Sequence, residues 1–119
     1  MIAGIGCDMI EIGRIERSCR SDRFMARVFS PAERAAYAGC ASRLAGCFAV
    51  KEALSKALGM GVRGFSLAEI SVLRDALGKP YVIAEGRAAA LVGERRIHAS
   101  ITNTAREALA FVILEEDTL

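Results

Sequence analysis

The hydrophobic period of the sequence changes near residue 60, and this change constrains the fold more than any other feature. Before it, apolar residues recur at helical spacing in a long run that opens at Ser42 or Arg43 and ends at Leu58, just before Gly59. After it, four short runs are apolar or alternate with polar residues, as strands do. These runs cover residues 67–73, 80–84, 96–102 and 108–114. Early helices followed by late antiparallel strands predict an α+β fold, with helices packed on a small antiparallel sheet.

The shorter elements are also predicted by local signals. Residues 2–10 are β-branched, apolar and punctuated by glycine, which is typical of a buried strand. Ser30, Pro31 and Glu33 form a capping box with proline in the first helical turn, so a helix starts there. The late strands are expected to form two hairpins, which turn at residues 75–80 and 103–106. Short helices are expected at residues 11–20, 23–28, 30–38 and 85–93.

The apolar content indicates a chain that buries surface against other copies of itself. Hydrophobic residues make up 53% of the 119 residues, but only 6% are aromatic. A chain of this length is expected to form one domain, residues 1–119, whose core needs no disulfides. Because small residues limit how much one small domain can bury alone, we expect neighbouring subunits to cover part of the apolar surface.

The cysteines and the net charge exclude several classes of protein. Four cysteines without C-x-x-C spacing and a single histidine do not make a usual zinc set. The sequence has no signal-peptide pattern and no apolar run of about 18 residues, which predicts a cytoplasmic protein with reduced thiols and no membrane partner. A disulfide framework is the alternative. A net charge of +2 is too small to indicate a nucleic-acid partner.

Five arginines gather in one short segment. Spacings of three and four residues place them largely along one side of a helical segment. They are Arg14, Arg17, Arg20, Arg23 and Arg27. One interpretation is a solvated face. The other is a docking surface for an acidic partner protein, because arginine makes bidentate contacts with carboxylates.

Glu52 and Lys56 stand out in the alanine-rich long helix. At about 100° per residue they lie on one side of the helix, next to Ala45 and Ala49 and away from the apolar arc expected to face the core. One interpretation is an ion pair one helical turn apart, worth about 0.3–0.5 kcal/mol. The other is a Mg²⁺ site, in which Asp8 supplies a second carboxylate and Lys56 meets a phosphate. Asp8 suits that role because a carboxylate near the end of a buried strand is costly unless it is paired, capping or bound to metal.

Five segments occur together and in a fixed order along the chain. They are GIGCDMIEIGRIE (4–16), RFMARVFSPAE (23–33), LAGCFAVKEALSKALGMG (44–61), LGKPY (77–81) and HASIT (98–102). In this order they resemble the holo-acyl carrier protein synthases, the small bacterial type of 4′-phosphopantetheinyl transferase. The G-I-G-x-D strand and the F-A-x-K-E-A-x-x-K-A helix are specific as a pair. The resemblance covers nearly the whole chain and implies the fold of that family.

The resemblance implies a reaction and a metal. The phosphopantetheine arm of coenzyme A would pass to a serine hydroxyl of an apo-acyl carrier protein, in fatty acid biosynthesis, and adenosine 3′,5′-bisphosphate would leave. By the matching motif positions, Asp8 and Glu52 would bind Mg²⁺, and Lys56 would contact the phosphates of the coenzyme. The serine proton would go either to Glu52 or to a metal-bound water, and the sequence leaves both open.

The resemblance also implies which residues bind the two substrates. Carrier-protein docking is implied at Arg14, Arg23, Phe24 and Arg27, whereas Arg17 and Arg20 are expected to be solvated. Coenzyme A contacts are implied at Lys56, Gly59, Gly61, Lys79, His98, Ser100 and Thr102. The last three share one strand face by period two, and the histidine of the matching segment reaches the site of a neighbouring subunit. Because the family assembles as a trimer with active sites between subunits, a homotrimer is expected.

Some of these positions have structural explanations, and others depart from the family pattern. Gly59 and Gly61 also suit a helix stop, and Lys79 also suits a surface turn. Asn103 stands where many relatives have a histidine, and Cys47 where many have an arginine. Both replacements remove a candidate phosphate donor, so the coenzyme contacts at these two positions are open.

Two other functions compete with the transferase. A non-catalytic module that binds carrier proteins would need the arginine face but not the set of Asp8, Glu52 and Lys56. A dinucleotide-binding enzyme is suggested by Gly4-x-Gly6, but the third glycine and the following strand–helix context of that fingerprint are missing. Glu33 also matches a family position, although its capping box explains it without chemistry.

Overall fold

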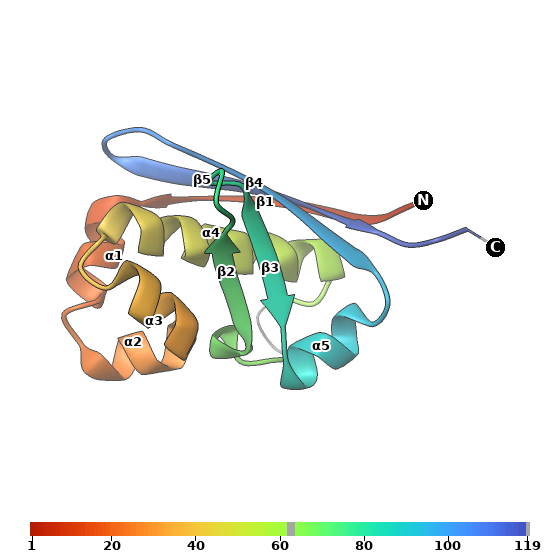
Figure 1. Ribbon diagram of the computed structural model, residues 1–119, viewed down its shortest axis with the longest axis horizontal. Coiled ribbons are helices and arrows are strands. Elements are labelled where there is room, and N and C mark those ends of the chain that lie inside the picture. The colour runs from red at the N-terminus through yellow and green to blue at the C-terminus, as the bar shows by residue number, and fades with distance from the viewer. Residues whose placement is uncertain (62–63, 119) are drawn as a thin grey trace.

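The computed structural model describes residues 1–61 and 64–118. The elements run in the order β1 (Ile2–Glu11), α1 (Ile12–Ser18), α2 (Asp22–Val28), α3 (Pro31–Tyr37), α4 (Ala41–Leu58), a 3₁₀ turn η1 (Leu67–Glu69), β2 (Ile70–Arg74), β3 (Pro80–Ala84), α5 (Gly86–Val92), β4 (Arg96–Asn103) and β5 (Glu107–Glu115). In Figure 1, α4 lies along the sheet formed by β1, β5 and β4, and the β2–β3 hairpin crosses it. The predicted α+β fold is confirmed.

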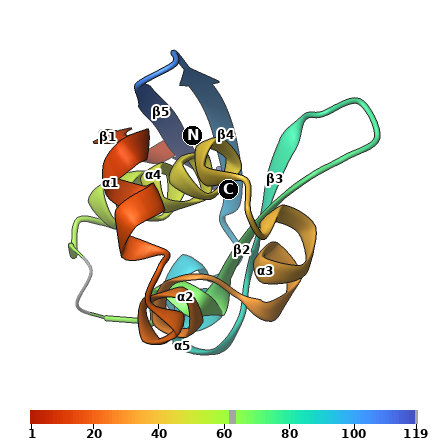
Figure 2. The same ribbon diagram turned by 90° about the vertical axis from the view of Figure 1, so that its left-hand side faces the viewer.

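Two antiparallel sheets flank the long helix. One has the strand order β1-β5-β4, and the other is the β2–β3 hairpin, so both predicted late strand pairs are confirmed. Figure 2 shows the tip of the hairpin projecting away from the three-stranded sheet. The expected strand over 67–73 begins only at Ile70, because Glu69 accepts the Ser66 backbone N–H at 2.9 Å and holds residues 67–69 in a 3₁₀ turn.

Two glycines allow β1 to lie directly against α4. A Cβ built on Gly4 would be 2.1 Å from the carbonyl oxygen of Ala57, and one on Gly6 would be 2.0 Å from that of Ala53. No side chain fits at such distances, so both positions require glycine. The two glycines lie inside a strand, not in the turn between a strand and a helix that a dinucleotide fingerprint needs. The dinucleotide-binding alternative is therefore wrong.

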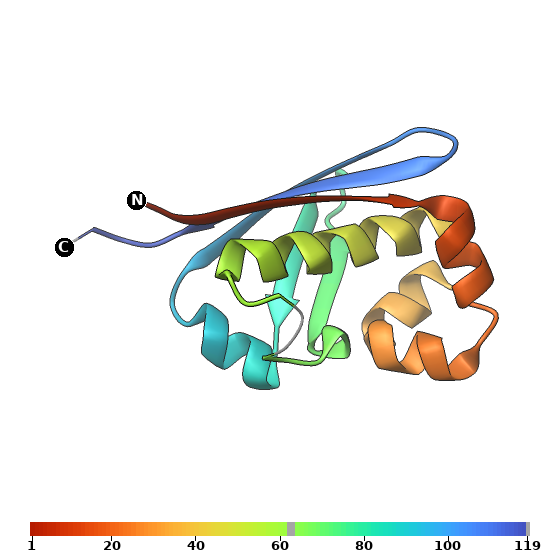
Figure 3. The ribbon, with the colours of Figure 1, turned by 180° about the vertical axis from the view of Figure 1, so that it is seen from behind.

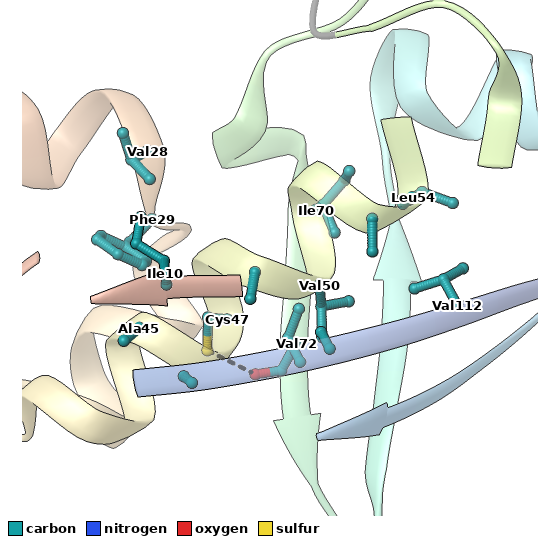
Figure 4. Packing of buried hydrophobic residues seen from close by; sticks show 14 of the residues in the cluster. Ile10, Val28, Phe29, Ala45, Cys47, Val50, Leu54, Ile70, Val72 and Val112 are labelled. Atoms are coloured by element: carbon teal, nitrogen blue, oxygen red, sulfur yellow. Dashed lines mark hydrogen bonds between the residues drawn. The ribbon is translucent and has the colours of Figure 1, made fainter. Parts of the chain in front are cut away.

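Helix α4 is buried on more sides than its sequence predicts. Ala45 and Ala49 were expected on an open side, but both are fully buried. The three-stranded sheet packs on α4 at Gly46 and Ala53, and the hairpin packs on the same helix at Cys47. Figure 4 shows Val72 of β2 and Val112 of β5 packed around Val50.

The N-terminal helices gather at one end of α4, and α5 lies at the other end (Figure 3). The predicted capping box of α3 is confirmed, since Ser30 Oγ accepts the Glu33 backbone N–H at 3.2 Å and Glu33 Oε1 accepts that of Ser30 at 2.9 Å. The five arginines do not follow one helical side. They are divided between α1 and α2 and the turn that joins them, because α1 ends at Ser18.

The four cysteines are all free, so the disulfide framework considered as an alternative is wrong. Cys47 is buried between α4 and β2, where its thiol donates to the Val72 carbonyl at 3.5 Å (Figure 4). Burial raises the pKa of the Cys47 thiol, which keeps it protonated. In residues 1–61 and 64–118, no helix combines the length and the apolar character needed to cross a membrane.

Candidate functional site

Asp8 and Lys56 meet where β1 crosses the C-terminal half of α4. Asp8 lies inside β1 rather than near its end, on the strand face that Gly4 and Gly6 turn toward the helix. Its side chain is 20% exposed, and its Oδ1 accepts a hydrogen bond from Lys56 Nζ at 3.2 Å. The same ammonium donates to the Cys7 carbonyl at 2.9 Å. The close approach made by the glycines thus brings together two charges that are far apart in the sequence.

Glu52 completes the cluster without bonding to Lys56. Partial burial raises the pKa of the Glu52 carboxyl, the negative charge of Asp8 raises it further, and the positive charge of Lys56 opposes both. In the described parts of the chain, Lys56 forms its ion pair with Asp8, and Glu52 forms none. The interpretation of Glu52 and Lys56 as an ion pair within the helix is therefore wrong.

The cluster has the donor chemistry of a magnesium site. Two carboxylates and one ammonium leave a net negative charge, which favours an added cation. Over residues 1–61 and 64–118, no group of three or more His, Cys, Asp or Glu side chains forms a complete metal cage. Mg²⁺ typically takes one or two carboxylates from a protein and fills its other positions with water and phosphate oxygens. The residues present fit that ion.

His98, Ser100 and Thr102 do share one strand face, as predicted, but it is not the face of Asp8. They pair in register with Ile113, Phe111 and Leu109 of β5, whereas Asp8 pairs with Ala110. Because opposed residues point the same way and successive residues alternate, the β4 row lies on the outer face of the sheet and Asp8 on the inner face. One chain therefore does not bring these predicted coenzyme contacts together.

The outer face also carries a charged contact. His98 Nε2 lies 2.9 Å from Glu115 Oε1. Asn103, one of the two departures from the family pattern, is exposed at the end of β4 and donates from Nδ2 to the Thr104 carbonyl at 3.2 Å. The other departure, Cys47, is buried and points at β2, so its thiol is not available to a ligand.

The glycines after α4 and the lysine of the hairpin are both exposed. Gly59 caps α4 with φ 74°, and Gly61 has φ 61°, so both adopt a left-handed conformation that favours glycine. They follow Lys56 by three and five residues in the sequence. Lys79 lies at the hairpin turn, where its backbone N–H donates to Asp75 Oδ1 at 2.9 Å. The turn fixes its backbone and leaves its side chain in solvent.

A groove beside the hairpin turn was not predicted from the sequence. It has a volume of about 600 Å³, and Tyr37, Arg43, Arg74 and Tyr81 line it together with the turn residues. These residues come from α3, α4, β2 and β3, so no local pattern in the sequence brings them together. Arg43 lies about half a turn from Glu52 around α4, so the groove and the carboxylate cluster lie on opposite sides of that helix.

The N-terminal helices carry exposed arginines and a half-buried aromatic ring. Arg14 is exposed on α1, and Arg23 and Arg27 are exposed on α2. The Phe24 ring packs edge-on against Phe29, with 6.2 Å between the ring centroids. Two of the predicted docking arginines thus lie on the same short helix as Phe24.

Comparison with known proteins places the whole chain in one family. A family model described as the 4′-phosphopantetheinyl transferase superfamily matches residues 4–112. A holo-[acyl-carrier-protein] synthase of Lachnoclostridium phytofermentans is 45% identical over 118 residues, which cover 97% of either chain. One from Edwardsiella ictaluri is 46% identical over 125 residues and covers 96% of this chain and 98% of its own.

Solved structures of the same family have the same fold. The holo-(acyl-carrier-protein) synthase of Bacillus anthracis, in complex with CoA (3′,5′-ADP), has a TM-score of 0.85 and 38% identity, and the match covers 98% of this chain and 99% of that one. The Helicobacter pylori enzyme, in complex with coenzyme A, has a TM-score of 0.81 and 31% identity, with coverage of 93% and 99%.

Proposed function

This chain belongs to the 4′-phosphopantetheinyl transferase superfamily, among its holo-[acyl-carrier-protein] synthases, and we propose that Asp8, Glu52 and Lys56 form its reaction centre. It transfers the 4′-phosphopantetheine group of coenzyme A to a serine hydroxyl of apo-acyl carrier protein, a step of fatty acid biosynthesis. Adenosine 3′,5′-bisphosphate leaves. The observation that carries the assignment of the centre is the contact of Lys56 with Asp8 beside Glu52, which forms no ion pair with any residue in 1–61 or 64–118.

Asp8 and Glu52 would hold Mg²⁺. When bound, this ion neutralises charge on the pyrophosphate of coenzyme A and on the leaving phosphate. The Lys56 side chain is 55% exposed, so it can turn from Asp8 to a phosphate oxygen of the coenzyme. We propose the Glu52 carboxylate, or a water beside it, as the acceptor of the serine proton.

We propose that a complete coenzyme A site needs two subunits of a homotrimer. The contacts at Lys56, Gly59 and Gly61 belong to one subunit, and those at Lys79, His98, Ser100 and Thr102 belong to its neighbour. What supports this division is that the row on β4 and Asp8 lie on opposite faces of the sheet. The groove beside the hairpin turn, with Arg43 and Arg74, suits the phosphate-bearing nucleotide end of the coenzyme in the neighbour.

The outer face of the three-stranded sheet supports the trimer. Four large apolar side chains on this face are exposed by 37% to 59%: Ile5, Met9, Leu109 and Phe111. They are adjacent across β1 and β5, since Met9 pairs with Leu109. A contiguous apolar surface of this kind is typical of a subunit interface.

We propose that the carrier protein docks on Arg14, Arg23, Phe24 and Arg27. Exposed guanidinium groups attract an acidic helix and orient it, and the Phe24 ring supplies an apolar contact at the centre. We also propose that the protein acts in the cytoplasm, where its four free thiols stay reduced.

The test is transfer from labelled coenzyme A to apo-acyl carrier protein, with Mg²⁺ and with EDTA. Transfer is expected with the metal, and EDTA is expected to stop it until Mg²⁺ is restored. Transfer that is indifferent to EDTA would overturn the metal site. No transfer to any apo-carrier, despite carrier binding, would favour the non-catalytic binding module.

A further inference from the structure

Lys51 is buried in the middle of the molecule, although it is adjacent in sequence to Glu52. Its side chain is 0% exposed, and its ammonium donates to Glu33 Oε1 and to the Val28 carbonyl, each at 2.6 Å. The same ammonium lies 5.2 Å from the centroid of the Phe29 ring, a cation–π distance. Lys51 therefore points away from the reaction centre and into the junction with α2 and α3.

Glu33, the partner of Lys51, accepts hydrogen bonds from three different parts of the fold. Its Oε1 accepts the Ser30 backbone N–H as well as Lys51, and its Oε2 accepts the Val72 backbone N–H at 2.8 Å. One carboxylate thus joins the start of α3, the middle of α4 and strand β2. Its side chain is 0% exposed, so solvent replaces none of these bonds if they are lost.

The pair connects the proposed docking surface to the proposed reaction centre. Val28 is the last residue of α2, the helix that carries Arg23, Phe24 and Arg27. The Phe29 ring under the ammonium is the ring against which Phe24 packs. On the other side, the backbone of Lys51 continues directly into Glu52. No other ion pair of the described residues is fully buried.

We propose that Lys51 and Glu33 are a positioning pair, which fixes the distance between the docked carrier protein and the Asp8–Glu52 centre. The inference rests on the proposed function, because it needs the carrier to dock on α2. A buried ion pair is weak evidence of stabilisation, since apolar residues of similar volume often replace one without loss of stability. Apolar residues that replace the pair can keep the fold stable, but they do not fix the position of α2 relative to α4 as the ion pair does. A misplacement of about 1 Å at a reacting hydroxyl can cost about 100-fold in rate.

The test uses the double variant Lys51→Met with Glu33→Gln, which removes both charges and keeps the side-chain lengths. We expect its melting temperature to be closer to wild type than that of either single variant, each of which leaves one buried charge unpaired. At saturating carrier, the single-turnover transfer rate is expected to fall about tenfold or more. The KM for carrier and the Kd for coenzyme A with Mg²⁺ are expected to stay within about threefold.

Glu33→Asp is the second variant, in case the double variant does not fold. It keeps the charge but shortens the reach, so the carboxylate cannot satisfy all three donors, and we expect the same loss of single-turnover rate. An unchanged rate per folded molecule would show that the pair only stabilises the fold and would overturn the proposal. So would a parallel weakening of coenzyme A binding, or a rise in KM with the rate unchanged.

Arg27→Ala separates this proposal from the proposed function. Its expected effect is a higher KM for carrier with little change in single-turnover rate, because it lies on the docking surface and outside the Lys51–Glu33 pair. If Arg27→Ala and its neighbour Arg23→Ala both leave the KM unchanged, the docking surface is wrong, whatever the pair does. If the KM rises in these variants and the pair variants keep the wild-type rate, only the positioning pair is wrong.

Discussion

Lys56 lies near two carboxylates, and it bonds to the one that is farther away in the sequence. Its ammonium is 3.2 Å from Asp8, and a partly exposed pair of this kind contributes only about 0.2–1 kcal/mol. A phosphate oxygen can therefore replace Asp8 at little cost. Glu52 is left beside a second negative charge and is partly desolvated. The arrangement favours binding a cation and a phosphate more than it favours stability.

We expect Glu52→Gln to lower the transfer rate about 100-fold or more, because an amide cannot supply the charge that a Mg²⁺ ligand needs. The melting temperature should stay constant or rise slightly, since the amide relieves the repulsion with Asp8. Both are measured on the same purified protein, by transfer assay and by circular dichroism. Glu94→Gln, at an exposed glutamate, is the matched control and should change neither. A lower melting temperature with normal turnover per folded molecule would contradict this assignment.

The raised pKa of Glu52 predicts how the stability of the magnesium-free protein depends on pH. The folded-state pKa lies above the ordinary value of 4.5, so the folded protein holds this proton more tightly than the unfolded chain does. The contribution of this group to the free energy of unfolding is therefore greatest below pH 4.5 and is lost as the pH rises through the raised pKa. Urea denaturation in EDTA at several pH values measures it. Glu52→Gln should remove this component, and an identical pH profile in the variant would refute it.

At the scale of elements, the contact between β1 and α4 depends on the absence of a side chain at Gly6. A methyl group there would be 2.0 Å from the Ala53 carbonyl oxygen and 2.9 Å from the Ala57 backbone nitrogen, and neither backbone atom can move alone. We expect Gly6→Ala to lower the free energy of unfolding by about 1–3 kcal/mol or more. It should also lower activity, because Asp8 follows on the same strand.

Gly13→Ala is the matched control for this substitution. Gly13 lies in α1, and a Cβ there would meet only the end of the Arg17 side chain, at 3.5 Å. Alanine suits a helix better than glycine, so this variant should be as stable as wild type or more stable by about 0.5–1 kcal/mol. Urea denaturation of both variants tests the pair. Equal stability of Gly6→Ala and wild type would mean that strand and helix can separate without cost.

Local signals predicted the elements well but did not predict what surrounds them. The capping box at Ser30 and the strand over 80–84 are as expected, because turn chemistry and short-range periodicity determine both. The surroundings of α4 differ from expectation because the helix is buried on two sides. The sequence of such a helix does not show one apolar face opposite one polar face. For the same reason, the sequence did not predict that Lys51 is buried while Lys56 is exposed. The partners Glu33 and Asp8 are supplied by distant elements.

At the scale of the whole molecule, the sequence predicted that Asp8 and Lys56 lie together, but it did not predict that the β4 row lies on the other face of the sheet. Asp8 and Lys56, which both the residue pattern and the family motifs assigned to one site, are in contact. His98 and Thr102 share a face as period two predicts. That this face turns away from Asp8 depends on the register of β5 between β4 and β1, which no local pattern encodes.

The proposed division of the site between subunits leads to a prediction about mixed oligomers. Each proposed site takes its metal ligands from one subunit and its β4 residues from the neighbouring subunit. Glu52→Gln damages only the first part of a site, and His98→Ala damages only the second. When the two variants are unfolded and refolded together in equal amounts, a site that takes Glu52 from one variant and His98 from the other is intact. Random assembly of a ring with shared sites makes about a quarter of all sites intact.

The refolded mixture should therefore recover about a quarter of wild-type transfer activity, well above the mean of the two variants refolded separately. Sedimentation analysis of the same samples checks that assembly is equal in all three. Activity that equals the mean of the separate variants, in a mixture that has assembled, would show that each chain contains its whole site.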